Sequence, residues 1–491
     1  MVSDTTALYN ALVARDARFD GVFYVGVTST RVYCRPVCTA RTPKAANCRF
    51  FASAEAAEKA SFRPCLRCRP ELAPGNAPVD DARRIAALLV QRIDEGMLDG
   101  GAGLENVARR FGWSSRQIRR IVRKELGVSP IELVLTRRLL RAKQLLTETQ
   151  LPMIDVASAS GFASVRRFND AFSRRYGLPP THFRKTARTS AAGSITETPL
   201  ELQLHYRPPL DWAALLQFLR ARATTGVEHV TDDAYLRTVS LGTRTGWLRV
   251  RHTAERRALL VQMAPTLAPV LPALLGRLRN LFDLDAHPDL IEAHLSRDPL
   301  LRRRIATRSG LRVPGAFDSF ELAVRAVLGQ LVTVKGATTL AGRFVAAFGT
   351  PIATPHENLT LLHPTPERIA VLAVSDIASL GITAMRAATI ISLAQEITSG
   401  RLTLEAGSHP ETSVAQLMSI RGIGAWTAQY IAMRALRWPD AFPKEDVALR
   451  KALGNVTAAR ADELSESWRP WRSYAALHLW QGASTPTARG P

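Results

Sequence analysis

Apolar residues recur with helical spacing between residues 104 and 111. Leu, Val, Ala and Phe fall at positions i, i+3, i+4 and i+7 of this segment, which places them on one face of a helix. A Gly-aromatic turn follows, and Ser114 with Gln117 then has the spacing of a capping box that opens a second helix. The pattern therefore predicts two short helices joined by a tight turn.

The second of these helices is expected to be amphipathic, with a basic outer face. Ile118, Ile121 and Val122 share its inner face. Its outward positions are occupied by four arginines, namely Arg116, Arg119, Arg120 and Arg123.

The whole pattern returns 49 or 50 residues later. "VARRFGWSSRQ" (107–117) is echoed by "VASASGFASVR" (156–166), and "GVSP" (127–130) by "GLPP" (177–180). In the second copy Phe168 and Phe172 face inward. The outward positions are again basic: Arg166, Arg167, Arg174 and Arg175. Two tandem helix-turn-helix units fit this repeat, each offering its second helix to a major groove.

The rest of the chain divides at polar segments rich in Pro, Gly and Ser, at 70–78 and 186–199. After the second segment, strand-like "TPLELQLHY" and "WLRVRHT" flank the helical "DWAALLQFLRARA", and from about residue 283 the pattern is mainly helical. We therefore expect a multidomain protein of α+β to mainly α class. Its expected domains are a small α/β domain (1–75), the tandem helix-turn-helix domain (80–188), a mixed α/β domain (199–282) and a helical domain (283–483).

The charge balance of the 491 residues indicates which kind of partner the protein binds. Lys and Arg number 65 against 43 Asp and Glu, a formal net charge of +22, which favours nucleic acid and, less strongly, an anionic membrane surface. A basic helix face alone is often only solvated surface, but repetition of the whole unit favours DNA. No run of 18 apolar residues and no signal-peptide pattern occurs, so we expect a cytoplasmic, nucleoid-associated protein without a membrane partner.

Four of the five cysteines form two close pairs, Cys34 with Cys38 and Cys65 with Cys68. In a reducing compartment this spacing suits tetrahedral Zn²⁺. Cys48 belongs to neither pair, and we expect it to be a free core thiol. Arginines crowd both pairs; positive charge and a metal would hold sulfur as thiolate and attract a phosphate backbone. A closed structural zinc site and a nucleophilic thiolate beside DNA both fit these residues.

A second chemical feature is "SIRGIGAWTAQYIAMRAL" (419–436). We expect a helix to end near Ser419 and another to begin at about Ala425, with Gly422 and Gly424 permitting a tight hairpin whose N–H groups approach a phosphate. Asp446 follows about twenty residues past the hairpin. An isolated Asp at a helix start is usually an N-cap, so catalysis and capping are both possible for it.

Three parts of the chain resemble known families. "GFASVRRFNDAFSRRYGLPPTHFR" (161–184) resembles the signature of AraC-type transcription regulators, over about 85 residues. "FDGVFYVGVTSTRVYCRPVCTAR" with "FRPCLRCRP" resembles the N-terminal domain of Ada-type adaptive-response proteins, over about 7–72. The hairpin, "FDSFELAVRAVLGQLVTVKGA" (317–337) and "WRPWRSYAALHLW" (468–480) resemble AlkA-type helix-hairpin-helix DNA glycosylases, over about 199–483.

The Ada resemblance implies that Cys34 is a zinc ligand that accepts a methyl group from a DNA methylphosphotriester, with Cys38, Cys65 and Cys68 completing the metal set. A neutral triester repels a thiolate less than an ordinary phosphate does. Methylation changes the zinc ion with its four cysteine ligands from net −2 to −1, so DNA should then bind more tightly. Cys34 would be consumed once per event and would be an acceptor rather than a turnover catalyst.

The AlkA resemblance implies that Asp446 stabilises the positive charge that develops on the sugar during N-glycosidic cleavage and helps water attack C1′. Trp426, Tyr430 and Trp480 would bind the alkylated purine, whose positive charge suits electron-rich rings, although each could instead be core packing. Leu331 would wedge into the stack that the base leaves. Trp426 stands where bifunctional relatives carry lysine, so strand cleavage is not expected.

These features together predict a bifunctional alkylation-damage response protein. It would be a zinc-dependent methyl acceptor and transcription activator fused to a monofunctional DNA glycosylase of the 3-methyladenine type. Damaged DNA, promoter DNA and RNA polymerase would be its partners. No cysteine follows Cys68, so we expect neither an iron–sulfur loop nor an O6-alkylguanine acceptor domain. Two alternatives remain: a transcription regulator whose glycosylase-like half only binds DNA, and a structural zinc protein that coats DNA.

Overall fold

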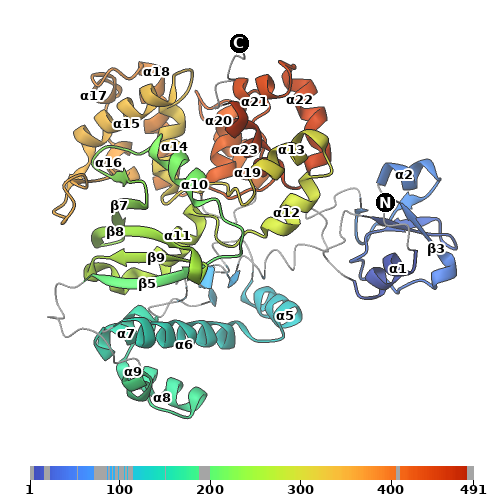
Figure 1. The fold of residues 1–491 in the computed structure, drawn as a ribbon, viewed down its shortest axis with the longest axis horizontal. Helices are drawn as coiled ribbons and strands as arrows, with labels where there is room; N and C mark the ends of the chain where they lie inside the picture. Colours follow the sequence, from blue (N-terminus) through green and yellow to red (C-terminus); the bar gives the residue numbers. More distant parts are fainter. Residues whose placement is uncertain are drawn as a thin grey trace. The chain divides into compact units, whose positions relative to one another are not determined.

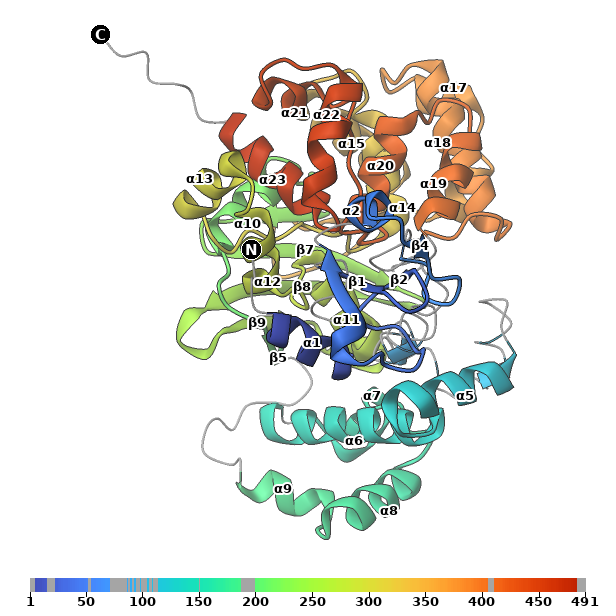
Figure 2. The same ribbon diagram turned by 90° about the vertical axis from the view of Figure 1, so that its right-hand side faces the viewer.

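The computed structural model describes residues 5–15, 23–51, 54–70, 114–149, 151–186, 199–404 and 410–483, with isolated positions between 86 and 108. They belong to two units, 1–93 with 97–137, and 94–96 with 138–491. Figures 1 and 2 show their helices and strands from two directions. Among the helices in these ranges, none combines the length and hydropathy of a bilayer span.

A four-stranded sheet of order β3-β1-β2-β4 organises the N-terminal domain. β1 pairs antiparallel with β2 and β3, and β4 runs parallel to β2. The strands are β1 (Tyr24–Val27), β2 (Val32–Cys34), β3 (Cys48–Phe51) and β4 (Arg63–Pro64), and the helices are α1 (Thr5–Val13) and α2 (Ala54–Lys59). This is the small α/β domain that the sequence predicted.

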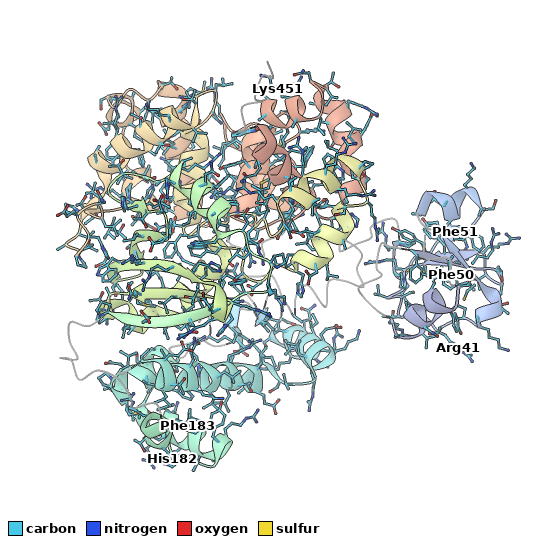
Figure 3. The ribbon with its side chains drawn as sticks, in the orientation of Figure 1. Arg41, Phe50, Phe51, His182, Phe183 and Lys451 are labelled. Carbon is cyan, nitrogen blue, oxygen red and sulfur yellow. The ribbon has the colours of Figure 1, made fainter. Side chains whose placement is uncertain are left out.

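Side chains alternate between the two faces of this sheet, as the period of a strand requires. Phe23 and Val25 pack with α1, whereas Tyr24 and Tyr33 pack with α2 and Phe62. The neighbouring rings Phe50 and Phe51 on β3 likewise join different clusters, and Figure 3 shows them pointing apart. The small core therefore holds the ends of β2 and β4, where Cys34 is the last residue of β2 and Cys65 directly follows β4.

The basic helix of the first repeat is α5 (Ser115–Leu126). Its capping box is present: the Gln117 amide donates to Ser114 Oγ at 3.2 Å, and the Ser114 amide donates to Gln117 Oε1 at 2.9 Å. Ile118 and Val122 are buried, but Ile121 is only half-buried, so the apolar face is narrower than predicted. Residues 109–113, which hold the predicted turn, lie outside the described part of the chain.

The second repeat is described over its whole length. Ser164 caps the basic helix by accepting from the Arg167 amide at 3.3 Å, and Phe168 and Phe172 are buried with ring centroids 5.5 Å apart, as predicted. The helices of this region are α6 (Pro130–Glu148), α7 (Met153–Ala159), α8 (Val165–Tyr176) and α9 (Pro180–Thr186).

Between residues 200 and 281 the chain forms an antiparallel sheet of order β5-β9-β8-β7-β6 with helices, the mixed α/β composition predicted for this part of the sequence. Its helices α10 and α11 contribute leucines to the same core as the strands. The elements are β5 (Leu200–His205), α10 (Trp212–Arg220), β6 (Glu228–Val230), β7 (Ala234–Leu241), β8 (Arg244–Thr253), β9 (Ala258–Met263) and α11 (Leu271–Leu281).

The C-terminal domain is mainly helical, as predicted, and encloses one large apolar core. Figure 1 shows its helices in yellow to red. They are α12 (Pro288–Leu295), α13 (Pro299–Thr307), α14 (Ser319–Leu328), α15 (Val334–Phe348), α16 (Pro366–Ala370), α17 (Val374–Ala378), α18 (Ala384–Thr398), α19 (Pro410–Ser419), α20 (Ala425–Arg434), α21 (Val447–Ala452), α22 (Ala458–Ser465) and α23 (Arg472–Ala483).

A buried ion network connects the mixed α/β domain to α14. Arg237 on β7 pairs with Glu321 at 2.8 Å, and Arg325 pairs with Glu228 on β6 at 2.6 Å. The side chains of Arg237 and Glu321 are at most 4% exposed. Because a buried charge without its partner is strongly destabilising, these pairs fix α14 against the sheet. The sequence did not predict this network, whose partners lie about 85 to 100 residues apart.

Candidate functional sites

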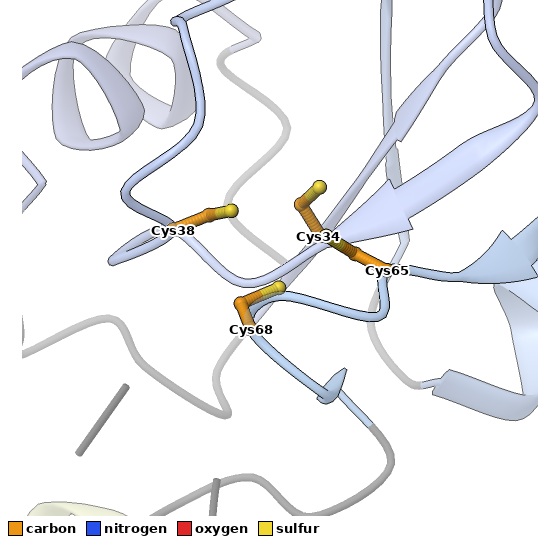
Figure 4. A group of neighbouring side chains, drawn as sticks. All are labelled: Cys34, Cys38, Cys65 and Cys68. Carbon is orange, nitrogen blue, oxygen red and sulfur yellow. The ribbon is translucent and has the colours of Figure 1, made fainter. Parts of the chain in front are cut away.

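Two turns of the N-terminal domain bring four cysteines together (Figure 4). Cys34 ends β2 and Cys65 follows β4; the parallel register of these strands places them side by side. Cys38 and Cys68 follow in the next turns. All four sulfur atoms lie within 4.8 Å of one another, and four Zn–S bonds of about 2.3 Å to one ion require such a cluster.

The charge of this four-cysteine cluster also fits a divalent cation. The pKa of the Cys34 thiol is raised, mainly by its hydrogen bond with Cys38, and to a smaller extent by its hydrogen bond with Cys68 and by burial. The pKa of Cys38 is lowered, mainly by its hydrogen bond with Cys34. The sulfurs therefore cannot all be anionic unless a cation balances them. Zn²⁺ supplies that balance, and the cysteines can supply the four thiolates of a tetrahedral site.

The basic surroundings of the cluster are mostly at the surface. One predicted member is different: Arg35 is fully buried, and its backbone N–H donates to Cys68 Sγ at 3.4 Å, so it supports the cluster from within. The other six arginines are exposed, namely Arg31, Arg41, Arg49, Arg63, Arg67 and Arg69. Cys48 lies outside the cluster, half-buried on β3, where its thiol donates to the Lys44 carbonyl at 3.4 Å.

The predicted DNA-contacting arginines lie on the two basic helices, α5 and α8. Arg119 forms an ion pair with Glu105 at 3.2 Å, between two side chains that are more than half exposed. All six are exposed, which leaves their guanidinium groups accessible to a phosphate: Arg116, Arg119, Arg120, Arg123, Arg166 and Arg167.

The hairpin between α19 and α20 begins and ends where the sequence predicted, at Ser419 and Ala425. Its two glycines differ in role. Gly422 has φ +93°, and a Cβ there would lie 2.1 Å from Thr389 Oγ1. Gly424 has φ −90° and precedes α20; no described atom lies within 4 Å of the place where its Cβ would stand. Gly422 is therefore required by the turn, whereas Gly424 leaves space for a ligand to approach the helix N-terminus.

Asp446 is both an N-cap and the centre of a hydrogen-bond cluster. Its Oδ1 accepts from the Leu449 amide at 2.9 Å, which caps α21, and also from the Trp480 indole at 3.0 Å. Its Oδ2 accepts from the Trp426 indole at 2.9 Å. The capping role is therefore confirmed, and the cap and the indoles together fix the carboxylate in one orientation. The catalytic role of Asp446 stays a prediction.

This carboxylate lines a cavity of about 400 Å³, a volume suited to a small organic ligand. The three predicted aromatic residues line it too. Trp426 and Tyr430 are stacked with ring centroids 5.4 Å apart and 7° between planes, and Trp480 lies 6.5 Å from Tyr430. All three are half-buried, and Tyr430 and Trp480 also pack against the large apolar core of the C-terminal domain.

Three arginines also line the cavity, and the sequence did not predict them. Arg434 donates to Tyr430 Oη at 2.8 Å and to the carbonyl groups of Pro314 and Gly315. Burial alone would raise the pKa of the Tyr430 phenol, but the positive charges of Arg434, Arg222 and Arg325 together outweigh burial and lower this pKa to about 8. Arg434 could have been predicted from its spacing, because a residue one helical turn after Tyr430 lies on the same face of the helix.

The other two cavity arginines come from the mixed α/β domain and from α14. Arg222 lies over the Phe218 ring at 3.8 Å, and Arg325 belongs to the buried ion network. The aromatic residues that the sequence predicted for this pocket are therefore joined there by positive charge.

Leu331 lies between α14 and α15 and is fully exposed (102%). Its φ is +56°, a conformation that side chains other than glycine rarely adopt. It does not line the cavity. An exposed apolar side chain on a constrained turn has the form of a wedge.

The fold and these sites, together with the family models below, define a zinc-binding and DNA-binding protein joined to a helix-hairpin-helix base-excision glycosylase. Family models match the metal binding domain of Ada over 7–71, a helix-turn-helix domain over 107–186, the AlkA N-terminal domain over 201–318 and the HhH-GPD superfamily of base excision DNA repair proteins over 324–471.

Similar proteins give the particular family. A probable bifunctional transcriptional activator/DNA repair enzyme AlkA of Mycobacterium tuberculosis is 38% identical over 100% of this chain and 99% of its own length. The chain belongs to this family of bifunctional transcriptional activators and DNA repair enzymes. DNA-3-methyladenine glycosylase 2 of Escherichia coli is 35% identical over 56% of this chain and 95% of its own. The structure of a 3-methyladenine DNA glycosylase from Archaeoglobus fulgidus shares the fold over 57% of this chain and 98% of its own, at 19% identity and a TM-score of 0.50.

Proposed function

We propose that this protein senses alkylation of the DNA backbone, activates transcription in response, and excises alkylated purines of the 3-methyladenine type. The observation that carries the excision role is the Asp446 carboxylate, held by Trp426 and Trp480 at the edge of the cavity. The four-cysteine cluster carries the sensing role.

Asp446 acts in excision through its fixed negative charge. Cleavage of the N-glycosidic bond develops positive charge on the sugar, and a preorganised carboxylate stabilises that charge without reorganising. The two indole donors and the Leu449 amide hold both oxygens in place. The base leaves as the N-glycosidic bond breaks. Water then adds to C1′ and gives up a proton with help from the same carboxylate.

The base is bound outside the duplex, because its glycosidic bond cannot be reached within the stack. The parallel rings of Trp426 and Tyr430 offer it a stacking surface. Leu331 enters the space that the base vacates, and the amides at Gly422 and Gly424 bind the adjacent phosphate. The position of Trp426 on the cavity wall leaves the site without a lysine nucleophile there, which supports hydrolysis alone.

Cys34 accepts the methyl group of a DNA methylphosphotriester. The four cysteines would hold Zn²⁺, and the ion would keep their thiolates deprotonated. The sulfur of Cys34 forms a bond to the methyl carbon, the bond from that carbon to the phosphate oxygen breaks, and a phosphodiester anion leaves. The cluster loses one negative charge, and the exposed arginines around it then bind DNA more tightly.

The helix-turn-helix units use this change in affinity to occupy a promoter. Exposed arginines on α5 and α8 are available to bind phosphates and base edges. Activation from a bound promoter requires contact with RNA polymerase, which we propose as a partner. A cytoplasmic protein bound to the nucleoid fits this role.

Excision by Asp446→Asn tests the glycosylase role. We expect the wild-type protein to release 3-methyladenine from a methylated duplex, and the variant to lose at least about a hundredfold in single-turnover rate, because the fixed charge is removed and one of the two acceptor oxygens is lost. The variant should keep its DNA affinity, since the hairpin is unchanged. Equal rates of release would assign catalysis to a residue other than Asp446. No release by either protein would instead favour a regulator whose C-terminal half only binds DNA.

Intact-mass analysis after incubation with methylphosphotriester DNA tests the sensor. The wild-type protein should gain the mass of one methyl group on Cys34, and Cys34→Ser should gain none. Cys48→Ser is the matched control, because Cys48 lies outside the cluster, and it should be methylated like wild type. A methyl group on another residue, or full transcription activation by Cys34→Ser, would favour a structural zinc protein.

A further inference from the structure

The residue directly before the wedge makes contacts that neither the cavity nor the metal site uses. The side-chain Nε2 of Gln330 donates to the Gly422 carbonyl at 2.8 Å and to Thr427 Oγ1 at 2.9 Å. Both partners belong to the hairpin and to the first turn of α20, about 90 residues further along the chain. One amide group thus joins the wedge segment to the hairpin.

The backbone of Gln330 is held as well. The guanidinium group of Arg386, in the first turn of α18, donates to the Gln330 carbonyl. The next residue, Leu331, has φ +56° and a fully exposed side chain. Packing therefore does not hold Leu331 in its unusual conformation, and the hydrogen bonds at Gln330 are its nearest restraints.

These contacts also reach the excision site. Thr427 is buried (3% exposed) and follows Trp426, whose indole donates to Asp446. Gly422 is the residue that the turn requires and is itself held against Thr389. A displacement of the wedge relative to the hairpin would have to break both bonds of the Gln330 amide.

We propose that Gln330 is a positioning residue for base extrusion. It couples the Leu331 wedge to the phosphate-binding hairpin and to α20, the helix that carries Trp426 and Tyr430 of the cavity. The proposal rests on the wedge role of Leu331 given above. The group must be an amide: a carboxylate at this position would turn an oxygen acceptor toward the Gly422 carbonyl, which is also an acceptor.

The test compares Gln330→Ala, Gln330→Glu, Leu331→Ala and the Gln330→Ala/Leu331→Ala double variant. Single-turnover excision is measured on a lesion paired in a duplex and on the same lesion opposite an abasic site, where extrusion requires little unpairing. Fluorescence of 2-aminopurine beside the lesion reports extrusion itself. Gln395→Ala is the matched control, because Gln395 also donates its side-chain amide to a backbone carbonyl, that of Ala370, at 3.1 Å.

We expect both single variants at position 330 to slow extrusion and to lower excision of the paired lesion by about tenfold or more, since unstacking and unpairing resist extrusion. The loss should fall below about threefold opposite an abasic site. The double variant should be no slower than Leu331→Ala, because the two residues act as one unit. Gln395→Ala should match wild type in every assay, and thermal unfolding should show that all variants fold.

Several outcomes would overturn this role. Wild-type extrusion in Gln330→Glu, an equal loss on both substrates, or losses that multiply in the double variant would each show that Gln330 does not position the wedge. A Leu331→Ala variant as fast as wild type would overturn the wedge role and this proposal together, yet leave Asp446 untouched. Absence of excision by the wild-type protein would overturn the proposed function itself.

Discussion

At the scale of single residues, positive charge around the cavity tunes the groups that line it: Arg434 and Arg222, with Arg325, lower the pKa of the Tyr430 phenol. The four cysteines and Asp446 were predicted from their residue types and short motifs, and the catalytic role of Asp446 stays a prediction. Arg434 and Arg222 were not predicted, because their role depends on which surfaces face the cavity, and Arg222 reaches it from a different domain. A motif therefore predicts which groups react, whereas the charges that tune them depend on packing.

The effect of these charges on Tyr430 can be measured as a pH dependence of excision. Its folded-state pKa of about 8 lies below the ordinary phenol value of about 10, so the phenolate is favoured and forms as pH rises through 8. A negative ring attracts a cationic purine more than a neutral one. We expect the ratio of excision rates for cationic 3-methyladenine over a neutral adenine adduct to rise a few-fold between pH 7 and 9.

Tyr430→Phe supplies the control for that pH profile. Phenylalanine keeps the stacking on Trp426 but has no titrating group, so the ratio of rates should not change across the same range. A pH step that persists in this variant would assign the titration to another group. The readout is a ratio on one protein, so a general loss of activity would not alter it.

At the scale of elements, the helices and strands followed from local pattern. The capping box of α5 and the helix ends at Ser419 and Ala425 depend on neighbours within a few residues, and all were predicted correctly. The buried pairs Arg237–Glu321 and Arg325–Glu228, and the contact of Gly422 with Thr389, were not predicted. Their partners are distant in sequence, and no periodicity encodes them.

The two hairpin glycines allow protein stability and DNA binding to be tested separately. Gly422→Ala should lower the free energy of unfolding by about 2–4 kcal/mol. Alanine would have to adopt the positive φ of this position, and its Cβ would also clash with Thr389. Gly454→Ala is the control for backbone strain alone: its φ is +94°, but no described atom would contact the Cβ, and we expect about 1–2 kcal/mol. Urea unfolding measures both, and equal losses would contradict the proposed clash.

Gly424→Ala should behave in the opposite way. Its φ of −90° suits alanine, and its Cβ would meet no described atom, so the loss of stability should stay near or below about 1 kcal/mol, the usual effect at an N-cap. The methyl group would, however, stand where a phosphate approaches α20. Affinity for undamaged duplex should therefore fall more in Gly424→Ala than in Gly454→Ala. Unchanged affinity would place the bound phosphate elsewhere.

At the scale of the whole molecule, a net charge of +22 makes DNA binding by this chain strongly dependent on salt. Such a protein binds any duplex to some extent, so a damage signal has to appear as a change in affinity above that background. Loss of one negative charge at the four-cysteine cluster provides it. The exposed arginines beside the cluster ensure that the remaining local charge is positive.

The size of that signal follows from the charge removed. A unit charge about 8 Å from a phosphate contributes about 0.5–2 kcal/mol for an effective dielectric constant between 80 and 20. Methylated protein should therefore bind one promoter duplex about two- to thirtyfold more tightly than unmethylated protein at ~0.1 M salt. At ~1 M salt the Debye length falls to about 3 Å, and the difference in affinity should nearly vanish.

Two cysteine variants are the controls for this gain in affinity. Cys48→Ser should show the same gain, whereas Cys34→Ser should show none after exposure to methylated DNA. A gain that persists at high salt would mean that methylation acts through a change of shape, since screening cannot remove a steric effect.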